Sequence, residues 1–209
     1  MDYPAIFERY AIPAVGVLHV GAYVGWEKQT YKAMGFQNVL FVEAQPGTFN
    51  RLLKVNLEGT GMHCENIAIG PHEGVTRFHI ANNGQSSSIL TLKKHLILHP
   101  EITEVGALDV RMTTIDTLLS WPKYAGMRFN FLNIDIQGAE LLAFTGAVRS
   151  LAHIDIINSE INFDELYEGG AHVRQLDAYL SAFGFVRADT VVSKGWGDAI
   201  YVRDHLTKV

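Results

Sequence analysis

Short runs of β-branched and aromatic residues alternate with helical stretches along most of this chain, and this order constrains the fold most strongly. The runs 17–20 and 39–43 are typical of strands, and the stretch 25–35 between them has helical character. Strands that alternate with helices in this way form βαβ units and a parallel sheet. The pattern therefore predicts an α/β fold with a doubly wound, mostly parallel sheet.

The same order continues through the rest of the chain, with one interruption at 70–112. We expect further strands at 62–69, 129–134 and 154–159, helices at 46–57, 113–119, 139–147 and 173–183, and an antiparallel pair at 185–192 and 199–202. In the interruption, an edge strand at 74–80 precedes the polar run 82–88, which is typical of a mobile loop or a lid over a ligand. A sheet that ends in an antiparallel hairpin is the arrangement of Rossmann-like methyltransferases. We expect residues 1–209 to form one such domain, self-standing or cut from a longer chain.

Composition narrows the classes of function. The 209 residues are 48% apolar and 19% charged, as in globular domains that bury a core. The formal net charge is −5, whereas nucleic-acid-binding proteins usually show a basic excess, so we expect no nucleic-acid partner. A single cysteine, Cys64, favours a reducing compartment, and no apolar run is long enough to span a bilayer. We therefore expect a cytoplasmic protein that does not insert into membranes.

A glycine-containing turn follows the first strand at 21–25, and Glu43 ends the second. Glycine allows a close approach between the backbone and a ligand, and the N-terminus of the next helix attracts negative groups. The spacing G-x-x-x-G differs from the dinucleotide fingerprint G-x-G-x-x-G, so a turn without a ligand remains an alternative. A carboxylate placed like Glu43, about 20 residues after the turn, can accept both hydroxyls of a ribose. A solvated glutamate at the strand end is the other interpretation.

Asp135 follows the strand at 129–134 and emerges at the sheet edge where α/β proteins bind ligands. Such a carboxylate can hold the amino group of a sulfonium donor, bind a metal or act as a base. Alternatively, it only caps the helix that begins near Gly138. Glu160 lies after the next strand, where it could hydrogen-bond the hydroxyls of an acceptor or be ordinary loop polarity. Tyr167 and Trp196 suit stacking on sugar rings at the rim, although Trp196 also fits a hairpin tip.

Several motifs occur together and in order along the chain. They are Val-Gly-Ala-x-x-Gly, Val-Glu-Ala-x-Pro, Asn-Ile-Ala-Ile-Gly, Ser-Ser-Ser-Ile-Leu and Asp-Ile-Gln-Gly-Ala-Glu-Leu. Over roughly residues 15–203, this set resembles the FkbM family of S-adenosylmethionine-dependent methyltransferases. The resemblance implies a class I methyltransferase fold and O-methylation, often of a sugar or polyketide hydroxyl.

The resemblance also implies donor-binding residues. Those expected to contact S-adenosylmethionine are Gly21, Tyr23 and Gly25 around the methionine part, Glu43 on the ribose, Ala44 and Ala68 beside the adenine, and Asp135 and Gln137 toward the methionine end or the acceptor. Two positions depart from the family pattern. Tyr23 stands where the family often has Asn, and Asn133 stands where it usually has Lys, so local contacts and charge balance can differ.

We therefore predict an enzyme that transfers a methyl group from S-adenosylmethionine to a hydroxyl of a carbohydrate, with Asp135 and Glu160 as candidate bases. Ser87 and Ser88 are expected to donate hydrogen bonds to donor or acceptor, with residues 82–90 as a lid or wall. A divalent metal is not favoured, because no clear second and third ligand accompany Asp135. The alternatives are a nicotinamide-dependent Rossmann oxidoreductase and a non-catalytic donor-binding module.

Overall fold

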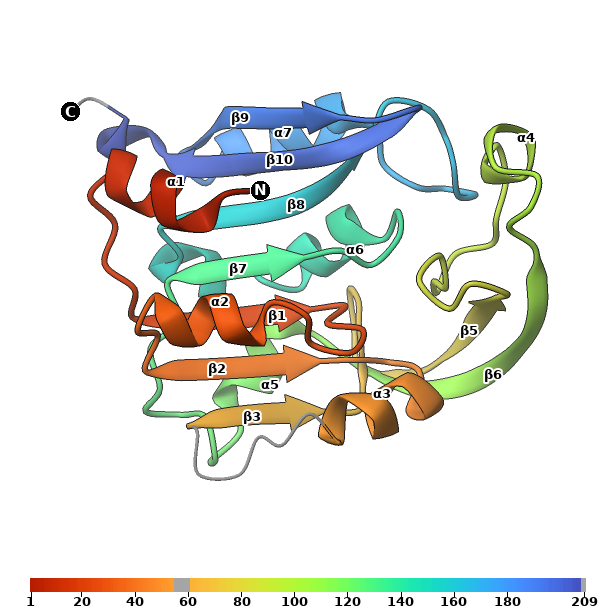
Figure 1. The fold of residues 1–209 in the computed structure, drawn as a ribbon, viewed down its shortest axis with the longest axis horizontal. Coiled ribbons are helices and arrows are strands. Elements are labelled where there is room, and N and C mark those ends of the chain that lie inside the picture. Colours follow the sequence, from red (N-terminus) through yellow and green to blue (C-terminus); the bar gives the residue numbers. More distant parts are fainter. Residues whose placement is uncertain (55–60, 208–209) are drawn as a thin grey trace.

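The protein, described here as a computed structural model, is defined over residues 1–54 and 61–207. The strands of its main sheet are β1 Gly16–Val20, β2 Asn38–Val42, β3 Met62–Glu65, β7 Phe131–Ile134, β8 Ile156–Asn162, β9 Phe185–Val192 and β10 Trp196–Arg203. They form a seven-stranded sheet in the order β3-β2-β1-β7-β8-β10-β9 (Figure 1). The first five of these run parallel, while β10 lies antiparallel to β8 and β9. The predicted doubly wound sheet with an antiparallel hairpin at its end is confirmed.

Helices cover both faces of this sheet (Figure 1). One face carries α1 Tyr3–Arg9, α2 Lys28–Ala33 and α3 Pro46–Leu53, and the other carries α5 Ile115–Ser120, α6 Glu140–Thr145 and α7 Val173–Ser181. Successive side chains of a strand point to opposite faces. In β1, Val17 consequently packs in the core under α1 and α2, whereas Leu18 and Val20 pack in the core under α5, α6 and α7.

Helix α1 lies in a stretch where sequence patterns predict no element. Pro4 stands in its first turn, where the missing N–H costs no hydrogen bond. The Asp2 carboxylate caps the helix by accepting the backbone N–H of Ala5 at 3.2 Å. Ile6 and Phe7 are buried against the sheet. These contacts attach the N-terminal segment to the face that carries α2 and α3.

A second sheet lies beyond the C-terminal ends of the parallel strands (Figure 1). It contains β4 Ala68–Ile69, β5 Gly74–Ala81 and β6 Glu104–Thr113 in the order β4-β6-β5, and the short helix α4 His95–Leu98 connects β5 with β6. The predicted single strand at 62–69 is wrong, because the chain divides there. Asn66 donates hydrogen bonds to the carbonyls of Glu43 and Ala44, and β4 then turns away to pair with β6.

Strand β6 lies where no strand is predicted. The reason is visible in its burial, because most side chains of its first half are exposed and lack the apolar alternation that signals a strand. Backbone pairing with β5 along nearly the whole length of β6 holds this strand in place instead.

Other predicted elements lie in place with shifted ends. Strand β8 is longer than predicted, so Glu160 lies within it and not in the following loop. Strand β10 begins at Trp196, which is therefore a strand residue and not the tip of the hairpin. Helix α2 begins at Lys28, not at residue 25, and the predicted extension of α3 to Leu57 falls outside the described residues. Over the ranges 1–54 and 61–207, no helix has the length and apolarity that a membrane span needs.

Candidate active site

A cavity of about 490 Å³ lies at the C-terminal edge of the main sheet. Residues at the ends of β1, β2, β7 and β8 line one side, and the loop after β5 lines another. This edge is where open α/β sheets bind ligands, at the point where the strand order reverses. Here the order reverses between β1 and β7. The volume lies within the range of about 300–1,000 Å³ that is usual for small-molecule sites.

The turn after β1 forms part of the cavity wall. Gly21 and Tyr23 line the cavity, and both have positive φ angles, 79° and 50°. A Cβ atom on Gly21 would lie 1.8 Å from the carbonyl oxygen of Asp135, so only glycine permits this approach between β1 and β7. Gly25 is not among the lining residues, and a Cβ atom there would meet Leu52 of α3 at 2.7 Å. Gly25 therefore allows the turn to pack closely against α3 and does not face the cavity.

Glu43 follows β2 directly and lines the cavity with only 7% of its surface exposed. Its carboxylate accepts the backbone N–H groups of Tyr23 at 2.9 Å and of Gln45 at 2.8 Å. Burial raises the pKa of Glu43 to about 7, although these hydrogen bonds oppose the shift. The interpretation as a solvated glutamate is thus wrong. Each oxygen keeps a second lone pair, which can accept a hydroxyl from the cavity.

Apolar side chains adjoin Glu43 and form what we call the apolar lobe of the cavity. Its members, which pack as one cluster and also line the cavity, are Ala44, Ala68, Phe78 and Ile89. They come from β4, from β5 and from the segments next to β2 and β5. The two alanines expected beside an adenine are therefore in one apolar surface next to the expected ribose partner.

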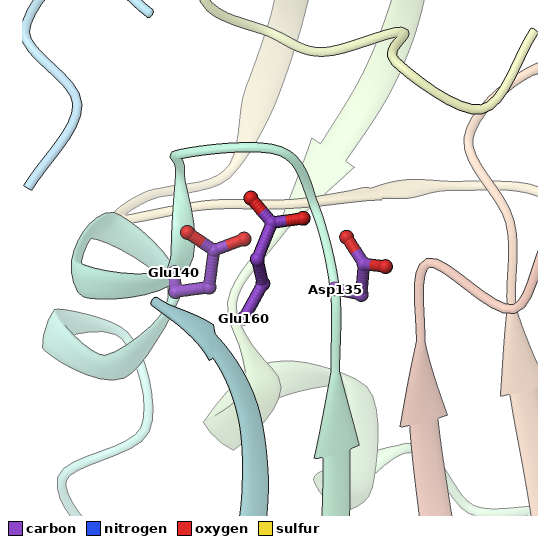
Figure 2. A group of neighbouring side chains, drawn as sticks. All are labelled: Asp135, Glu140 and Glu160. Carbon is purple, nitrogen blue, oxygen red and sulfur yellow. The ribbon is translucent and has the colours of Figure 1, made fainter. Parts of the chain in front are cut away.

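Three carboxyl groups gather where β7, α6 and β8 meet (Figure 2). Asp135 follows β7, Glu140 opens α6 and Glu160 lies on β8, and one oxygen of each lies within 4.8 Å of the others. Asp135 is exposed in the cavity, and Glu160 lines it while being 4% exposed.

Glu140 has a different position from its two neighbours. It is 2% exposed and accepts the backbone N–H groups of Ile136 at 2.9 Å and Gly138 at 3.3 Å. Glu140 thus holds the turn into α6. No side chain caps α6 at its N-cap residue, Ala139. The interpretation of Asp135 as a simple helix cap is therefore wrong.

Gln137 links the two carboxyl groups of the cavity. Its amide nitrogen donates to Asp135 at 2.7 Å and also to Glu160, and its amide oxygen accepts the Tyr167 hydroxyl at 2.6 Å. Tyr167 is 1% exposed, and its hydroxyl oxygen also lies 3.2 Å from the carbonyl oxygen of Ser86, which shares the same proton. The expectation that Tyr167 stacks on a sugar at the rim is wrong, because its ring is buried behind Gln137.

Electrostatics distinguishes the members of the carboxyl cluster. Burial, followed by the negative charges of Asp135 and Glu140, raises the pKa of Glu160 well above its usual range. Burial and the charge of Asp135 raise the pKa of Glu140 to about 7. Burial among like charges therefore disfavours the charged form of Glu160. Asp135, in contrast, is the member of the cluster that is exposed in the cavity.

The polar run after β5 forms a wall of the cavity. Ser87 lines the cavity and accepts the N–H of Ala81 at 3.0 Å, and backbone hydrogen bonds in both directions join Ser88 to His79. Ser88 is 1% exposed and does not line the cavity; its hydroxyl donates to the carbonyl of Ile136 at 3.2 Å. The run is thus hydrogen-bonded to its surroundings on both sides and forms the wall that is one of the two expected arrangements.

Comparison with known proteins identifies the family. A family profile described as the methyltransferase FkbM domain matches residues 19–187. The chain belongs to the FkbM methyltransferase family. The resemblance found in its sequence motifs is thereby confirmed.

One curated relative is the 2-O-methyltransferase NoeI of Sinorhizobium fredii strain NGR234, 28% identical over 133 residues. The match covers 60% of this chain and 54% of NoeI, so the chain spans about half the length of that relative.

Solved structures agree with the FkbM family assignment at the level of the fold. Methyltransferase FkbM from Methylobacillus flagellatus KT superposes with a TM-score of 0.56 at 14% identity, covering 90% of this chain and 43% of that one. Magnesium protoporphyrin IX methyltransferase from Synechocystis PCC 6803, solved with bound S-adenosylmethionine, gives a TM-score of 0.53 at 10% identity, covering 96% and 77%. The Rossmann-like methyltransferase fold is confirmed.

The structure also adds residues to those expected to bind the donor. Those that line the cavity from the face of the sheet under α1 are Tyr3, His19, Trp26, Glu27, Asn133, Asn158 and Asp198. Part of this set has a sequence signal. His19 and Asn133 each stand two positions before a predicted site residue, so the alternation of a strand puts them on the same face as that residue.

Proposed function

We propose that this FkbM-family protein transfers a methyl group from S-adenosylmethionine to a hydroxyl group of a carbohydrate. The observation that carries the proposal is that Glu43 and the pair Asp135–Glu160 line one cavity. The first offers a partner for a ribose, and the second offers a proton acceptor within the same space.

The residues of the cavity fit S-adenosylmethionine. The Glu43 carboxylate has free lone pairs for the two ribose hydroxyls, and the apolar lobe offers a surface for the adenine ring. The amide of Gln137 lies just after β7, on the side where the resemblance implies the methionine end of the donor or the acceptor. When bound, this cofactor supplies an activated methyl group on a sulfonium.

The chain must then align the acceptor and remove its proton. The bound donor would supply the methyl carbon that the hydroxyl oxygen attacks, and the electron pair of the carbon–sulfur bond would remain on sulfur. The hydroxyl proton goes to Asp135, whose carboxylate is exposed in the cavity. The Gln137 amide, which also donates to Glu160, holds Asp135 in place by a hydrogen bond.

Two observations support a hydroxyl of a sugar as the acceptor. The relative NoeI is named a 2-O-methyltransferase, which supports oxygen as the methylated atom. Trp196 and a set of carboxyl and amide side chains line the same cavity as Asp135. Such side chains suit the apolar faces and the hydroxyls of sugar rings.

Two measurements test the proposal. Calorimetry should show binding of S-adenosylhomocysteine and no comparable binding of NAD. Incubation with methyl-labelled S-adenosylmethionine and a panel of glycans, RNA and protein should label glycans alone. Binding of NAD in place of S-adenosylhomocysteine, or labelling of RNA or protein but no glycan, would contradict it. Tight donor binding without labelling of any acceptor would favour a non-catalytic donor-binding module.

A further inference from the structure

We infer that the part of the cavity under α1 is an acceptor subsite for a sugar unit that carries neither phosphate nor carboxylate. Trp26 and Trp196 would form its walls, and Glu27, Asn158 and Asp198 its hydrogen-bonding partners. The inference rests on the proposed function, because it specifies the class of acceptor. We call this part of the cavity the polar lobe.

A series of polar contacts links Asn158 to Glu27 across adjacent strands. Asn133 and Asn158 are register partners on β7 and β8, and the Asn158 amide donates to Asn133 at 2.8 Å. The Asn133 amide lies 3.3 Å from Nε2 of His19 on β1, and Nδ1 of His19 lies 3.8 Å from the Glu27 carboxylate. Tyr3 of α1 lines the same cavity. Helix α1 therefore contributes directly to its lining.

Asn158 shows that the polar lobe is incomplete. It lines the cavity, is 5% exposed, and its Oδ1 atom has no hydrogen-bond partner among the residues that the structure describes. Leaving a buried acceptor atom unpaired costs free energy. A ligand that donates a hydrogen bond, such as a hydroxyl or an amine, removes this cost, whereas an ionised phosphate or carboxylate has no proton to donate.

The charge of the lining residues disfavours anionic acceptors as well. Six carboxyl groups line the cavity, and within the described part of the chain no Lys or Arg does. Burial raises the pKa of Glu27 and of Asp198. The positive charge of the Met1 α-amino group lies near both and acts to lower these pKa values. A bound phosphate would face several carboxyl groups. Sugar hydroxyls, in contrast, can donate to carboxylates and accept from protonated carboxyls.

Trp26 supplies the second independent observation. Its side chain lines the cavity and yet is 66% exposed. Its ring packs edge-to-face on Tyr23, with centroids 5.2 Å apart at 69°, so the indole is supported on one side and open on the other. Arg51 lies over the Tyr23 ring and does not line the cavity. An exposed indole held in this way is suited to stack on the apolar face of a sugar ring.

The experiment separates acceptor binding from donor binding and from transfer. Saturation-transfer NMR measures binding of methyl glycosides of neutral hexoses, 6-deoxyhexoses and hexosamines, with hexose phosphates, uronic acid glycosides and nucleoside diphosphate sugars as the anionic set. We expect signals from one or more of the first set and none from the second. Trp26→Ala and Asn158→Ala should each weaken glycoside binding by roughly tenfold or more, because each removes a direct contact.

Matched variants complete the design. Trp26→Phe, which keeps an aromatic ring, should restore part of the glycoside affinity. Ile97→Ala alters a side chain that is 76% exposed and does not line the cavity, so it should change nothing. In all four variants the dissociation constant of S-adenosylhomocysteine should stay within about twofold, because the apolar lobe and Glu43 are untouched.

The outcomes distinguish the two proposals. Binding of neutral glycosides without methyl transfer would support the polar lobe and contradict the proposed function. Methyl transfer to phosphate-bearing sugars, with no binding of neutral glycosides, would support the proposed function and overturn the inference. Unchanged glycoside binding in both Trp26→Ala and Asn158→Ala would also overturn it. Absence of both binding and transfer would contradict both proposals.

Discussion

The carboxylate of Glu43 accepts the backbone N–H of Tyr23 at 2.9 Å, and this contact ties the end of β2 to the turn that follows β1. One buried side chain thus both shapes the turn and faces the cavity. In Glu43→Ala, both functions are lost together. Affinity for S-adenosylhomocysteine should fall by about 1.5–3 kcal/mol, the range for hydrogen bonds to a charged group. Calorimetry measures this change.

Glu65 offers a matched control for this variant. It ends the neighbouring strand β3, bonds to Lys123 and Tyr124, and does not line the cavity. Glu65→Ala should therefore leave the donor affinity unchanged. Equal donor affinities in wild type and Glu43→Ala would contradict the assignment of Glu43 to the ribose.

Asp135→Asn tests the base. The turn into α6 depends on Glu140 and not on Asp135, so the melting temperature should change little. Transfer should slow by at least ~100-fold, the lower end of general-base effects. If Asp135 instead holds the amino group of the donor, the affinity for S-adenosylhomocysteine will fall together with the rate. Full activity in the variant would remove Asp135 from the mechanism.

Stability should depend on pH through the buried glutamates. Burial raises the pKa of Glu43 and of Glu140 from 4.5 to about 7, so the folded state binds these protons more tightly than the unfolded state. Their contribution to stability is complete below pH 4.5 and is lost as the pH rises toward 7. The loss is on the order of 3 kcal/mol for each group.

Glu140→Gln isolates one of these two contributions. The amide oxygen can still accept the N–H groups of Ile136 and Gly138, while the titration disappears. Burial lowers the pKa of His19 to about 4, but this opposing effect is common to both proteins and cancels in the comparison. Urea unfolding between pH 5 and 7.5 should show a shallower decline for the variant. Parallel curves would show that Glu140 does not titrate as expected.

A chelator tests the metal alternative. Glu140 and Glu160 place further carboxyl oxygens next to Asp135, which a metal ion could use as ligands and which the sequence pattern does not indicate. However, Glu140 already accepts two backbone N–H groups, and Glu160 accepts the amides of Gln137 and Asn162. We therefore expect full methyl transfer in EDTA. Loss of activity that Mg²⁺ restores would show that these groups bind a metal during the reaction.

The sequence predicts the main sheet well because its strands carry strong local signals. The carboxylates after β2 and β7 could be placed from those signals alone, since each follows directly on an apolar strand. The second sheet could not be predicted, because β6 is held by pairing with β5 and not by an apolar pattern. The predicted position of Tyr167 at the rim of the site is wrong for a related reason. Whether an aromatic ring is buried or at a rim depends on the tertiary packing around Gln137 and Gly138.

The close approach of Gly21 to the Asp135 carbonyl has a mechanical consequence. There is no room for a side chain between these two strand ends, and the backbone N–H of Asp135 also donates to the carbonyl of Val20 at 3.0 Å. Therefore the backbone at Gly21, in the turn proposed to bind the methyl donor, forms one rigid body with the backbone at Asp135, the proposed base. Displacement of either backbone segment would therefore displace the other, which couples the two sides of the cavity mechanically.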